Sequence, residues 1–282
     1  MLRIGLSASG KVMNEDLFKQ YSEAGITCME VTPTLMDADK ETLLEVKGWA
    51  EKYGVELWSF HLPFAPFDEI DLSNPALCDK TIERYMAIIK NVAPLGIDLF
   101  VVHPSGEPID DEDRPVRLET SKKSLSRLAD LAAEEGVTIA VEDIPRTCIG
   151  RNSGEILEIL NENDKLVCCF DINHLLGEDN VDFVKKVGKK IKTLHVSDYD
   201  FINERHWLPG EGKNDWQGIY NALLEVGYNG PWLYEIGFKC PKTIIRDRDL
   251  TTEDFARNAK EIFENKPLTV FSTHKENLGM WE

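Results

Sequence analysis

The chain alternates short apolar runs with longer segments in which apolar residues recur every three or four positions. The short runs are rich in β-branched and aromatic residues and have the length of buried strands, whereas the longer segments have the periodicity of amphipathic helices. Eight such strands are predicted, beginning near residues 3, 28, 56, 98, 138, 166, 192 and 232. Each is followed by a segment that can form a helix.

Helical spacing is clearest in three of the longer segments. Their apolar stripes are Ile82, Tyr85, Met86, Ile89 and Ala93; Leu125, Leu128, Ala129 and Ala132; and Phe255, Ala259, Ile262 and Phe263. A glycine, the residue that favours helix C-termini, stands shortly before several of the predicted strands, at positions 25, 54, 96, 136 and 227. Helix, glycine and strand therefore repeat along the chain.

Nearly continuous apolar strands joined by helices predict a parallel sheet that is covered on both faces. Eight strand–helix units close naturally into an α/β (β/α)8 TIM barrel, and 282 residues suit the roughly 250 that such a barrel needs. We assign residues 1–266 to one barrel. An open doubly wound sheet is the alternative, but no Gly-x-Gly-x-x-Gly follows the first strand. Residues 267–282 are expected to be a tail whose Phe271, Met280 and Trp281 pack on the barrel or on a neighbouring subunit.

Composition narrows the classes of function. A formal net charge of −18 disfavours a nucleic-acid partner, because a polyanion would be repelled. No apolar run approaches the ~18 residues of a membrane span, and the N-terminal residues do not resemble a signal peptide. The six cysteines lack zinc-site spacing, so reduced thiols are expected. These features favour a cytoplasmic enzyme without a membrane partner, with homo-oligomerisation left open.

Polar residues stand where the predicted strands end, and in a TIM barrel the carboxyl ends of the strands form the active face. They are His61, His103, Glu142, Asp171, His174, His195, Asp198 and Glu235. A carboxylate after the fifth, sixth and eighth strands and an imidazole after the seventh would point one cluster at the barrel axis. Unpaired carboxylates at that spacing repel one another, so a divalent cation is expected.

Glu142, Asp171, His195 and Glu235 are the predicted ligands of that cation. Oxygen and nitrogen ligands without thiolate suit Mn²⁺, Zn²⁺, Co²⁺ or Mg²⁺. Such an ion, with positions open for substrate oxygens, acidifies a carbon next to a carbonyl, and Glu142 and Glu235 could then move the proton. The chemistry predicted from these residues is isomerisation or epimerisation through an enediolate.

Seven motifs give the chain a family resemblance. They are FHLPF at 60–64, VVHPSG at 101–106, VEDIP at 141–145, FDINH at 170–174, LHVSD at 194–198, HWLPGEGKNDW at 206–216 and YEIG at 234–237. With them the chain resembles the xylose isomerase-like TIM barrels over about residues 1–266. That superfamily includes sugar isomerases, ketose epimerases, hydroxypyruvate isomerase, inosose dehydratase and apurinic endonuclease.

The resemblance implies a metal-dependent enzyme that acts on a small sugar, a sugar phosphate or a polyol-derived ketone. It assigns Glu142, Asp171, His195 and Glu235 as metal ligands and the two glutamates as catalytic acid and base. It also implies that His174 contacts a substrate oxygen. Ketose epimerases carry a further glutamate and an arginine where this chain has Cys148 and Phe201.

Three alternatives are kept. The extra metal ligands of the endonuclease members match His61, His103, His174 and His206, with Glu204 in place of an aspartate. On the sugar-enzyme interpretation these histidines line the substrate site, and His174, Glu204 and His206 could hold a second ion. An inosose dehydratase-like lyase and a barrel that binds sugar without turnover are the others.

Two further groups could contact a substrate. The loop at 239–248, which contains Lys239, Lys242, Arg246 and Arg248, could bind a phosphate or a carboxylate. An apolar wall for a sugar is expected from Trp58, Phe60, Phe64, Phe67 and Trp207.

Overall fold

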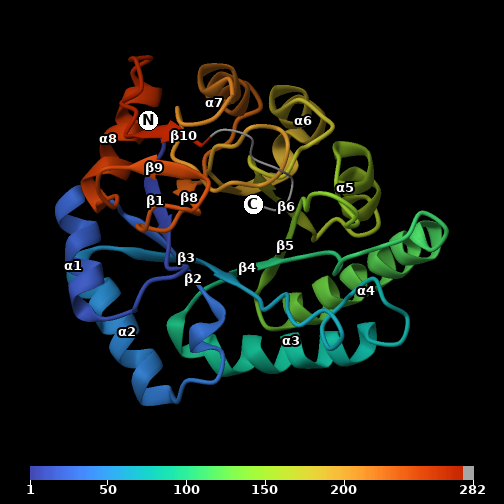
Figure 1. Cartoon of the computed structure of the whole chain (residues 1–282). Helices are drawn as coiled ribbons and strands as arrows, with labels where there is room; N and C mark the ends of the chain where they lie inside the picture. The colour runs from blue at the N-terminus through green and yellow to red at the C-terminus, as the bar shows by residue number, and fades with distance from the viewer. Residues whose placement is uncertain (276–282) are drawn as a thin grey trace.

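Eight parallel strands form the centre of the molecule, and the helices α1 to α8 surround them (Figure 1). The computed structural model describes residues 1–275. The strands are β1 (Ile4–Ser7), β2 (Cys28–Val31), β3 (Glu56–His61), β4 (Leu99–Val102), β5 (Thr138–Glu142), β6 (Val167–Asp171), β7 (Ile191–His195) and β8 (Trp232–Tyr234). Each begins within one residue of its predicted start, and the predicted (β/α)8 barrel is confirmed.

The barrel closes between its seventh and eighth strands. β1 to β7 pair in chain order, and β8 lies beside β1. A parallel bridge between Val196 and Tyr234 completes the ring. There the backbone N–H of Val196 donates to the carbonyl of Leu233 at 2.8 Å, and that of Glu235 donates to the carbonyl of Val196 at 3.2 Å. Closure therefore holds the residues that follow β7 and β8 next to each other.

The helices are α1 (Glu15–Ala24), α2 (Lys40–Tyr53), α3 (Cys78–Val92), α4 (Arg114–Glu134), α5 (Ser153–Leu160), α6 (Asn180–Val187), α7 (Trp216–Glu225) and α8 (Thr252–Phe263). Short 3₁₀ turns, η1 (Pro33–Leu35), η2 (Ala93–Leu95) and η3 (Gly188–Lys190), join some of them to neighbouring segments. Side chains of Asn14 and Asp39 accept backbone N–H groups at the starts of α1 and α2. Gly25 and Gly54 end these helices with φ of 84° and 65°, which a residue with a side chain rarely adopts.

Alternation along the strands divides the core into two layers. Side chains of one parity, such as Phe60, Phe100 and Phe170, pack outward against the helices. Those of the other parity fill the barrel, where Leu99, Val101, Ala140 and Cys169 form a small separate cluster. Because successive strand residues face opposite sides, the residues two positions beyond this cluster also point inward. These include His103, Glu142 and Asp171.

A two-stranded antiparallel ribbon lies beside the barrel. It joins β9 (Ile244–Arg246) to β10 (Ser272–His274). Phe271, just before β10, packs under the guanidinium groups of Arg248 and Arg257 at 4.9 and 5.2 Å from its ring centre. Met280 and Trp281, for which packing on the barrel or a neighbouring subunit was expected, lie outside the described residues.

Across residues 1–275, none of the helices has the length and apolar character that crossing a bilayer would require.

Neighbouring leucines on α2 test the packing of the helical layer. Leu43 is 1% exposed and Leu44 is 48% exposed. We expect Leu43→Ala to lower the free energy of unfolding by about 2–5 kcal/mol, because it leaves a cavity between α2 and the sheet. Leu44→Ala should change it by less than about 0.5 kcal/mol. Urea denaturation followed by circular dichroism measures both, and equal losses would contradict the orientation of this helix.

Candidate metal centre and active site

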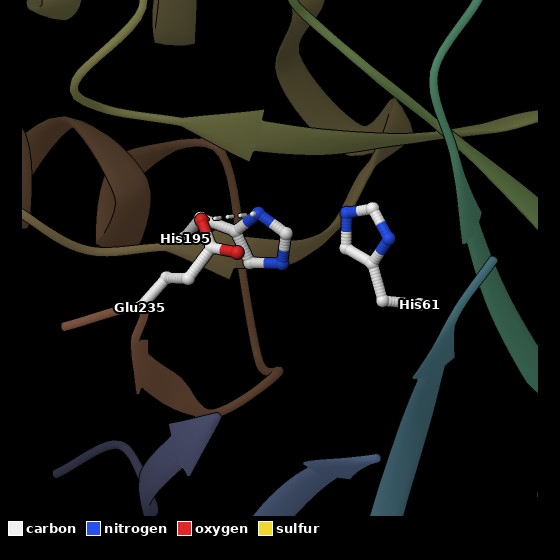
Figure 2. A group of neighbouring side chains, drawn as sticks. All are labelled: His61, His195 and Glu235. Carbon is white, nitrogen blue, oxygen red and sulfur yellow. Dashed lines mark ion pairs between the residues drawn. The ribbon is translucent and has the colours of Figure 1, made fainter. Parts of the chain in front are cut away.

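Four side chains from the carboxyl ends of the strands converge inside the barrel. One ligand atom from each of Glu142, Asp171, His195 and Glu235 lies within 4.8 Å of the other three. Nδ1 of His195 lies 3.0 Å from Oε1 of Glu142, 3.5 Å from Oε2 of Glu235 and 3.8 Å from Oδ2 of Asp171. Figure 2 shows Glu235 beside the imidazole of His195. The structure thus brings together the four residues that the sequence predicted as a cluster.

Strand ends position these groups. Glu142, Asp171 and His195 are the last residues of β5, β6 and β7, and Glu235 directly follows β8. Asp171 and His195 are register partners across β6 and β7. Asp171 is also held from its other side, because its backbone N–H donates to Oδ1 of Asp143 at 2.8 Å. The cluster therefore belongs to the rigid part of the barrel rather than to its loops.

The cluster carries more negative charge than its protein surroundings balance. Burial raises the pKa of Asp171 to about 8, and the nearby carboxylates of Glu235 and Glu142 contribute to that rise against the opposing effect of His174. Oδ2 of Asp171 is fully buried without a hydrogen-bond donor. An unsatisfied buried carboxylate oxygen beside two other carboxylates and an imidazole fits a divalent cation well. These four residues could hold one.

The two glutamates of this cluster border a cavity, and of the two Glu142 is buried, at 1% exposure. A cavity of about 470 Å³ opens at the carboxyl ends of the strands, and Glu142 and Glu235 are among its lining residues. Asp171 and His195 are fully buried and lie behind its wall. A small molecule in the cavity would therefore meet both glutamates directly.

Two further histidines contact the other oxygen of Glu142. Nε2 of His61 lies 3.1 Å from Oε2 of Glu142, and Nε2 of His103 lies 3.3 Å from it. Although burial opposes it, hydrogen bonding to Glu142 raises the pKa of His61 to about 9. Nδ1 of His61 donates to the carbonyl of Leu62 at 2.8 Å. The rings of His61 and His195 lie nearly parallel in Figure 2, with their centres 5.7 Å apart. Both His61 and His103 line the cavity.

The remaining predicted site residues line another part of the same cavity. His174 donates from Nδ1 to the carbonyl of Asp143 at 2.7 Å, and its Nε2 lies 3.0 Å from Oε2 of Glu204. His206 donates to the carbonyl of Glu235, and its Nε2 lies 4.0 Å from Glu204. In the described residues 1–275, the ligand atoms of His174, Glu204 and His206 do not all lie within 4.8 Å of one another, as they do in the four-residue cluster.

Four charged residues of the site, Glu30, Lys11, Glu107 and Arg146, were not predicted. Glu30 on β2 is completely buried, and its carboxylate contacts Nε2 of His195. Lys11, after β1, donates to the carbonyls of Ser7, Ser9 and Ile236, and burial lowers its pKa to about 7 against the attraction of Glu235. Arg146 lines the cavity beside Glu107 and Glu204. Only Glu30 had a signal in the sequence, as a lone carboxylate inside an apolar strand.

The carboxylate of Asp198 holds the loop after β7 in place by hydrogen bonds. Oδ2 of Asp198 accepts the N–H groups of Gly210 and Gly212 and the indole N–H of Trp216 at 2.8–2.9 Å. Oδ1 accepts the backbone and side-chain N–H groups of Asn214. Asp198 is thus an organising residue of the loop that carries Glu204 and His206 into the cavity wall.

Two expectations about substrate contacts are corrected. The arginines of the loop at 239–248 are engaged elsewhere: Arg246 pairs with buried Glu211, and Arg248 pairs with Asp254 of α8. Of the predicted aromatic wall, Phe64 and Phe67 line the cavity. Phe60 and Trp207 are buried in packing contacts. Trp58 donates to Thr193 and stacks on Arg3 near the amino ends of the strands.

Comparison with known families agrees with this architecture. The sequence profile of the family described as xylose isomerase-like TIM barrel matches residues 18–256. The chain belongs to this family. The match confirms the resemblance inferred from the seven motifs.

Individual relatives include sugar-converting enzymes. An inosose dehydratase of Geobacillus thermodenitrificans is 26% identical over 56% of this chain and 63% of its own length. A ketose 3-epimerase of Arthrobacter globiformis is 24% identical over 76% of this chain and 74% of its own. The crystal structure of a D-tagatose 3-epimerase-like protein superposes with a TM-score of 0.75 at 21% identity, covering 94% of this chain and 96% of that one. That structural likeness supports the fold.

Metal titration tests the four-residue cluster. We expect Mn²⁺ or Co²⁺ at a hundred times its dissociation constant to raise the free energy of unfolding by about 2.7 kcal/mol, since only the folded cluster binds it. Asp171→Asn should remove most of that gain. Asp164→Asn, at an exposed position, is the matched control and should keep it. Thermal unfolding with and without the ion measures the difference, and equal stabilisation of both variants would rule out this site.

Proposed function

We propose that the protein is a metal-dependent sugar isomerase or epimerase that moves a proton at a carbon next to a carbonyl group. The observation that carries the proposal is the division of the cluster: Glu142 and Glu235 are among the residues that line the cavity, whereas Asp171 and His195 are not. Two carboxylates that face one small cavity can act as a base and an acid on the same substrate. Family membership and the similarity to a ketose 3-epimerase also support it.

Glu142, Asp171, His195 and Glu235 would hold the divalent ion, which when bound supplies Lewis-acid polarisation of the substrate carbonyl. Glu142 and Glu235 would remove the proton from the neighbouring carbon and return it. Asp171 and His195, fixed at the ends of β6 and β7, would keep the two glutamates at constant spacing. Because the cluster is built on strands, these distances are defined before the substrate arrives.

Histidines around the cavity would orient the substrate. His61 and His103 stand on one side of Glu142, and His174 and His206 stand near Glu204. Imidazole N–H groups at these places can donate to hydroxyl or carbonyl oxygens of a sugar. Cys148 and Phe201 stand where ketose epimerases carry a glutamate and an arginine, so those two groups have no counterparts at these positions. Cys148 lines the cavity, and Phe201 is 37% exposed. The proposal is therefore proton transfer at a sugar carbon, with isomerisation, epimerisation and dehydration as its possible outcomes.

An endonuclease-like phosphodiesterase is the second candidate, and a specific group favours it. His61, His103 and Glu142 could hold another ion, because their ligand atoms lie within 4.8 Å of one another. The loop after β7 argues against a duplex substrate. Its Arg205 is paired with Asp200, and Asp198 folds the loop over its own backbone. Incision of abasic duplex DNA at moderate salt by the metal-loaded protein would favour this candidate.

Glutamate variants test the proton-transfer proposal. The Mn²⁺-loaded protein is screened against ketoses, ketose phosphates, inosose and hydroxypyruvate in D₂O, where turnover should place solvent deuterium at the reacting carbon. Glu142→Gln and Glu235→Gln should each lower kcat/KM by roughly 10²–10⁴-fold, because each removes an acid–base group. His174→Ala should mainly raise KM.

Glu83→Gln, on the exposed surface of α3, makes the same chemical change away from the cavity and should retain full turnover. Unchanged thermal unfolding of the metal-free variants would separate loss of chemistry from loss of fold. Near wild-type activity in either cavity variant would place the acid and base elsewhere.

A further inference from the structure

The wall of the cavity contains a charge cluster that the proposed chemistry does not use. The guanidinium of Arg146 donates from Nε and Nη2 to the two oxygens of Glu107, at 3.0 and 2.5 Å. Its Nη1 donates to Glu204 at 2.6 Å and to the side-chain oxygen of Asn203 at 2.9 Å. Two-point pairing of this kind fixes the plane of the guanidinium. Arg146 is thus held between two carboxylates, and all three charged residues line the cavity.

The backbone at Arg146 is unusual in a way that indicates a built position. Arg146 has a φ of 59°, in the left-handed region that side chains disfavour. Such conformations persist where surrounding contacts enforce them, and they concentrate at functional sites. Glu107 comes from the β4–α4 loop and Glu204 from the β7–α7 loop, so partners from both sides hold the arginine.

Carboxylates already occupy the guanidinium of this cluster. Two carboxylates surround one guanidinium, and Glu142 and Glu235 add negative charge on the same cavity. A bound divalent ion would offset only part of the charge of Glu142, Asp171 and Glu235. A phosphate or carboxylate group entering the cavity would have to compete with the carboxylates of Glu107 and Glu204 for the guanidinium of Arg146.

We propose that the Glu107–Arg146–Glu204 cluster makes the cavity selective for uncharged sugars over their phosphorylated or acidic forms. This inference rests on the proposed function and names its substrate class. Phe64 and Phe67, 42% and 37% exposed at the cavity, offer an apolar surface to such a sugar. The cluster acts on specificity: it excludes anions and leaves its carboxylate oxygens as acceptors for hydroxyl groups.

A comparison of free and phosphorylated ketoses tests the selectivity. The Mn²⁺-loaded protein is assayed with D-fructose, D-psicose and D-tagatose and with the 6-phosphate of each. We expect kcat/KM for the best free ketose to exceed that of its phosphate by roughly tenfold or more, since Glu107 and Glu204 already occupy the arginine that a phosphate would need. Glu107→Gln should reduce this ratio at least several-fold. Glu112→Gln, exposed on the same loop, is the matched control and should leave it unchanged.

Binding of inorganic phosphate gives a second result that does not depend on turnover. Calorimetric titration of the metal-free full-length protein should detect no phosphate binding to the wild type. Glu107→Gln should bind phosphate at least tenfold more tightly than the weakest affinity that the titration can detect. Preference of the wild type for a phosphorylated ketose, or submillimolar phosphate binding to it, would overturn the inference. Absence of turnover with every ketose would instead count against the proposed function, and the phosphate titration would still decide the charge question.

An independent observation concerns the imidazole of the metal cluster. Nε2 of His195 lies 3.0 and 3.1 Å from the two oxygens of Glu30, on the side opposite to the other ligands. Ser59, the register partner of Glu30 on β3, donates to the same carboxylate at 2.9 Å. Glu30 and His195 are both completely buried. A carboxylate that accepts the Nε2–H proton directs the Nδ1 lone pair toward Glu142, Asp171 and Glu235.

We infer that Glu30 is a positioning residue for the metal centre. It fixes the tautomer and ring orientation of His195 without touching the ion or the substrate. Glu30→Gln keeps an acceptor of similar shape but removes the charge. Loss of such an outer partner is expected to weaken metal binding by roughly 10–100-fold.

Co²⁺ titration followed by visible absorption measures this effect directly. Glu30→Gln should bind Co²⁺ roughly 10–100-fold more weakly with a shifted band, and Ser59→Ala should cause a smaller loss in the same direction. The exposed variant Glu83→Gln should bind like the wild type. Affinity of a folded Glu30→Gln within twofold of the wild type, with an unshifted band, would overturn the inference. If Glu30→Gln fails to fold, Ser59→Ala decides in the same way.

Discussion

The structure depends on one geometric constraint: a closed parallel barrel points every second side chain of each strand at a common axis. On β5 and β6 this parity carries apolar residues, Ala140 and Cys169, inside the barrel and then turns the next inward residues, Glu142 and Asp171, toward the axis. Because all strands run in the same direction, their polar ends share one level. Carboxylates from separate parts of the chain therefore meet without any loop having to place them.

That convergence has an electrostatic consequence. Burial removes water from the carboxylates, and the four residues of the cluster include an imidazole but no lysine or arginine. Imidazoles stabilise part of the negative charge of the carboxylates. Although burial opposes it, His195 and His103 hold the pKa of Glu142 well below its ordinary value. Asp171 keeps a raised pKa and an unsatisfied oxygen. The cluster thus keeps negative charge and a buried oxygen without a hydrogen-bond partner, which is what the proposed cation would offset.

The sequence was sufficient for the parts that follow from periodicity. Strand starts, the end glycines of the helices and the convergence of Glu142, Asp171, His195 and Glu235 follow from alternation and from the barrel rule. Glu30 shares that alternation, but it stands in the middle of its motif rather than at its end and was overlooked. Arg146 and Lys11 could not be found, because their places depend on loop conformation and on partners far along the chain, such as Glu204 and Ile236. The arginines near residue 248 were misassigned for the same reason, since Glu211 and Asp254 lie on other elements.

The residues that the sequence predicted lie at strand ends, and those that it missed lie mostly in loops; the two groups also have different roles in the proposed function. The side chains at the strand ends, such as Glu142 and Asp171, would determine where an ion binds and where a proton is transferred. Every barrel with the same residues at its strand ends would share them. Groups placed by loops need local backbone strain: Arg146, Phe201 and His206 have positive φ in the loops after β5 and β7. Such conformations cost of order 1–3 kcal/mol each and are kept only where other contacts enforce them. Asp198 and Glu107 supply such contacts to the two loops. Under the proposed function, the strand ends would carry the reaction and these loops would select the molecule on which it acts.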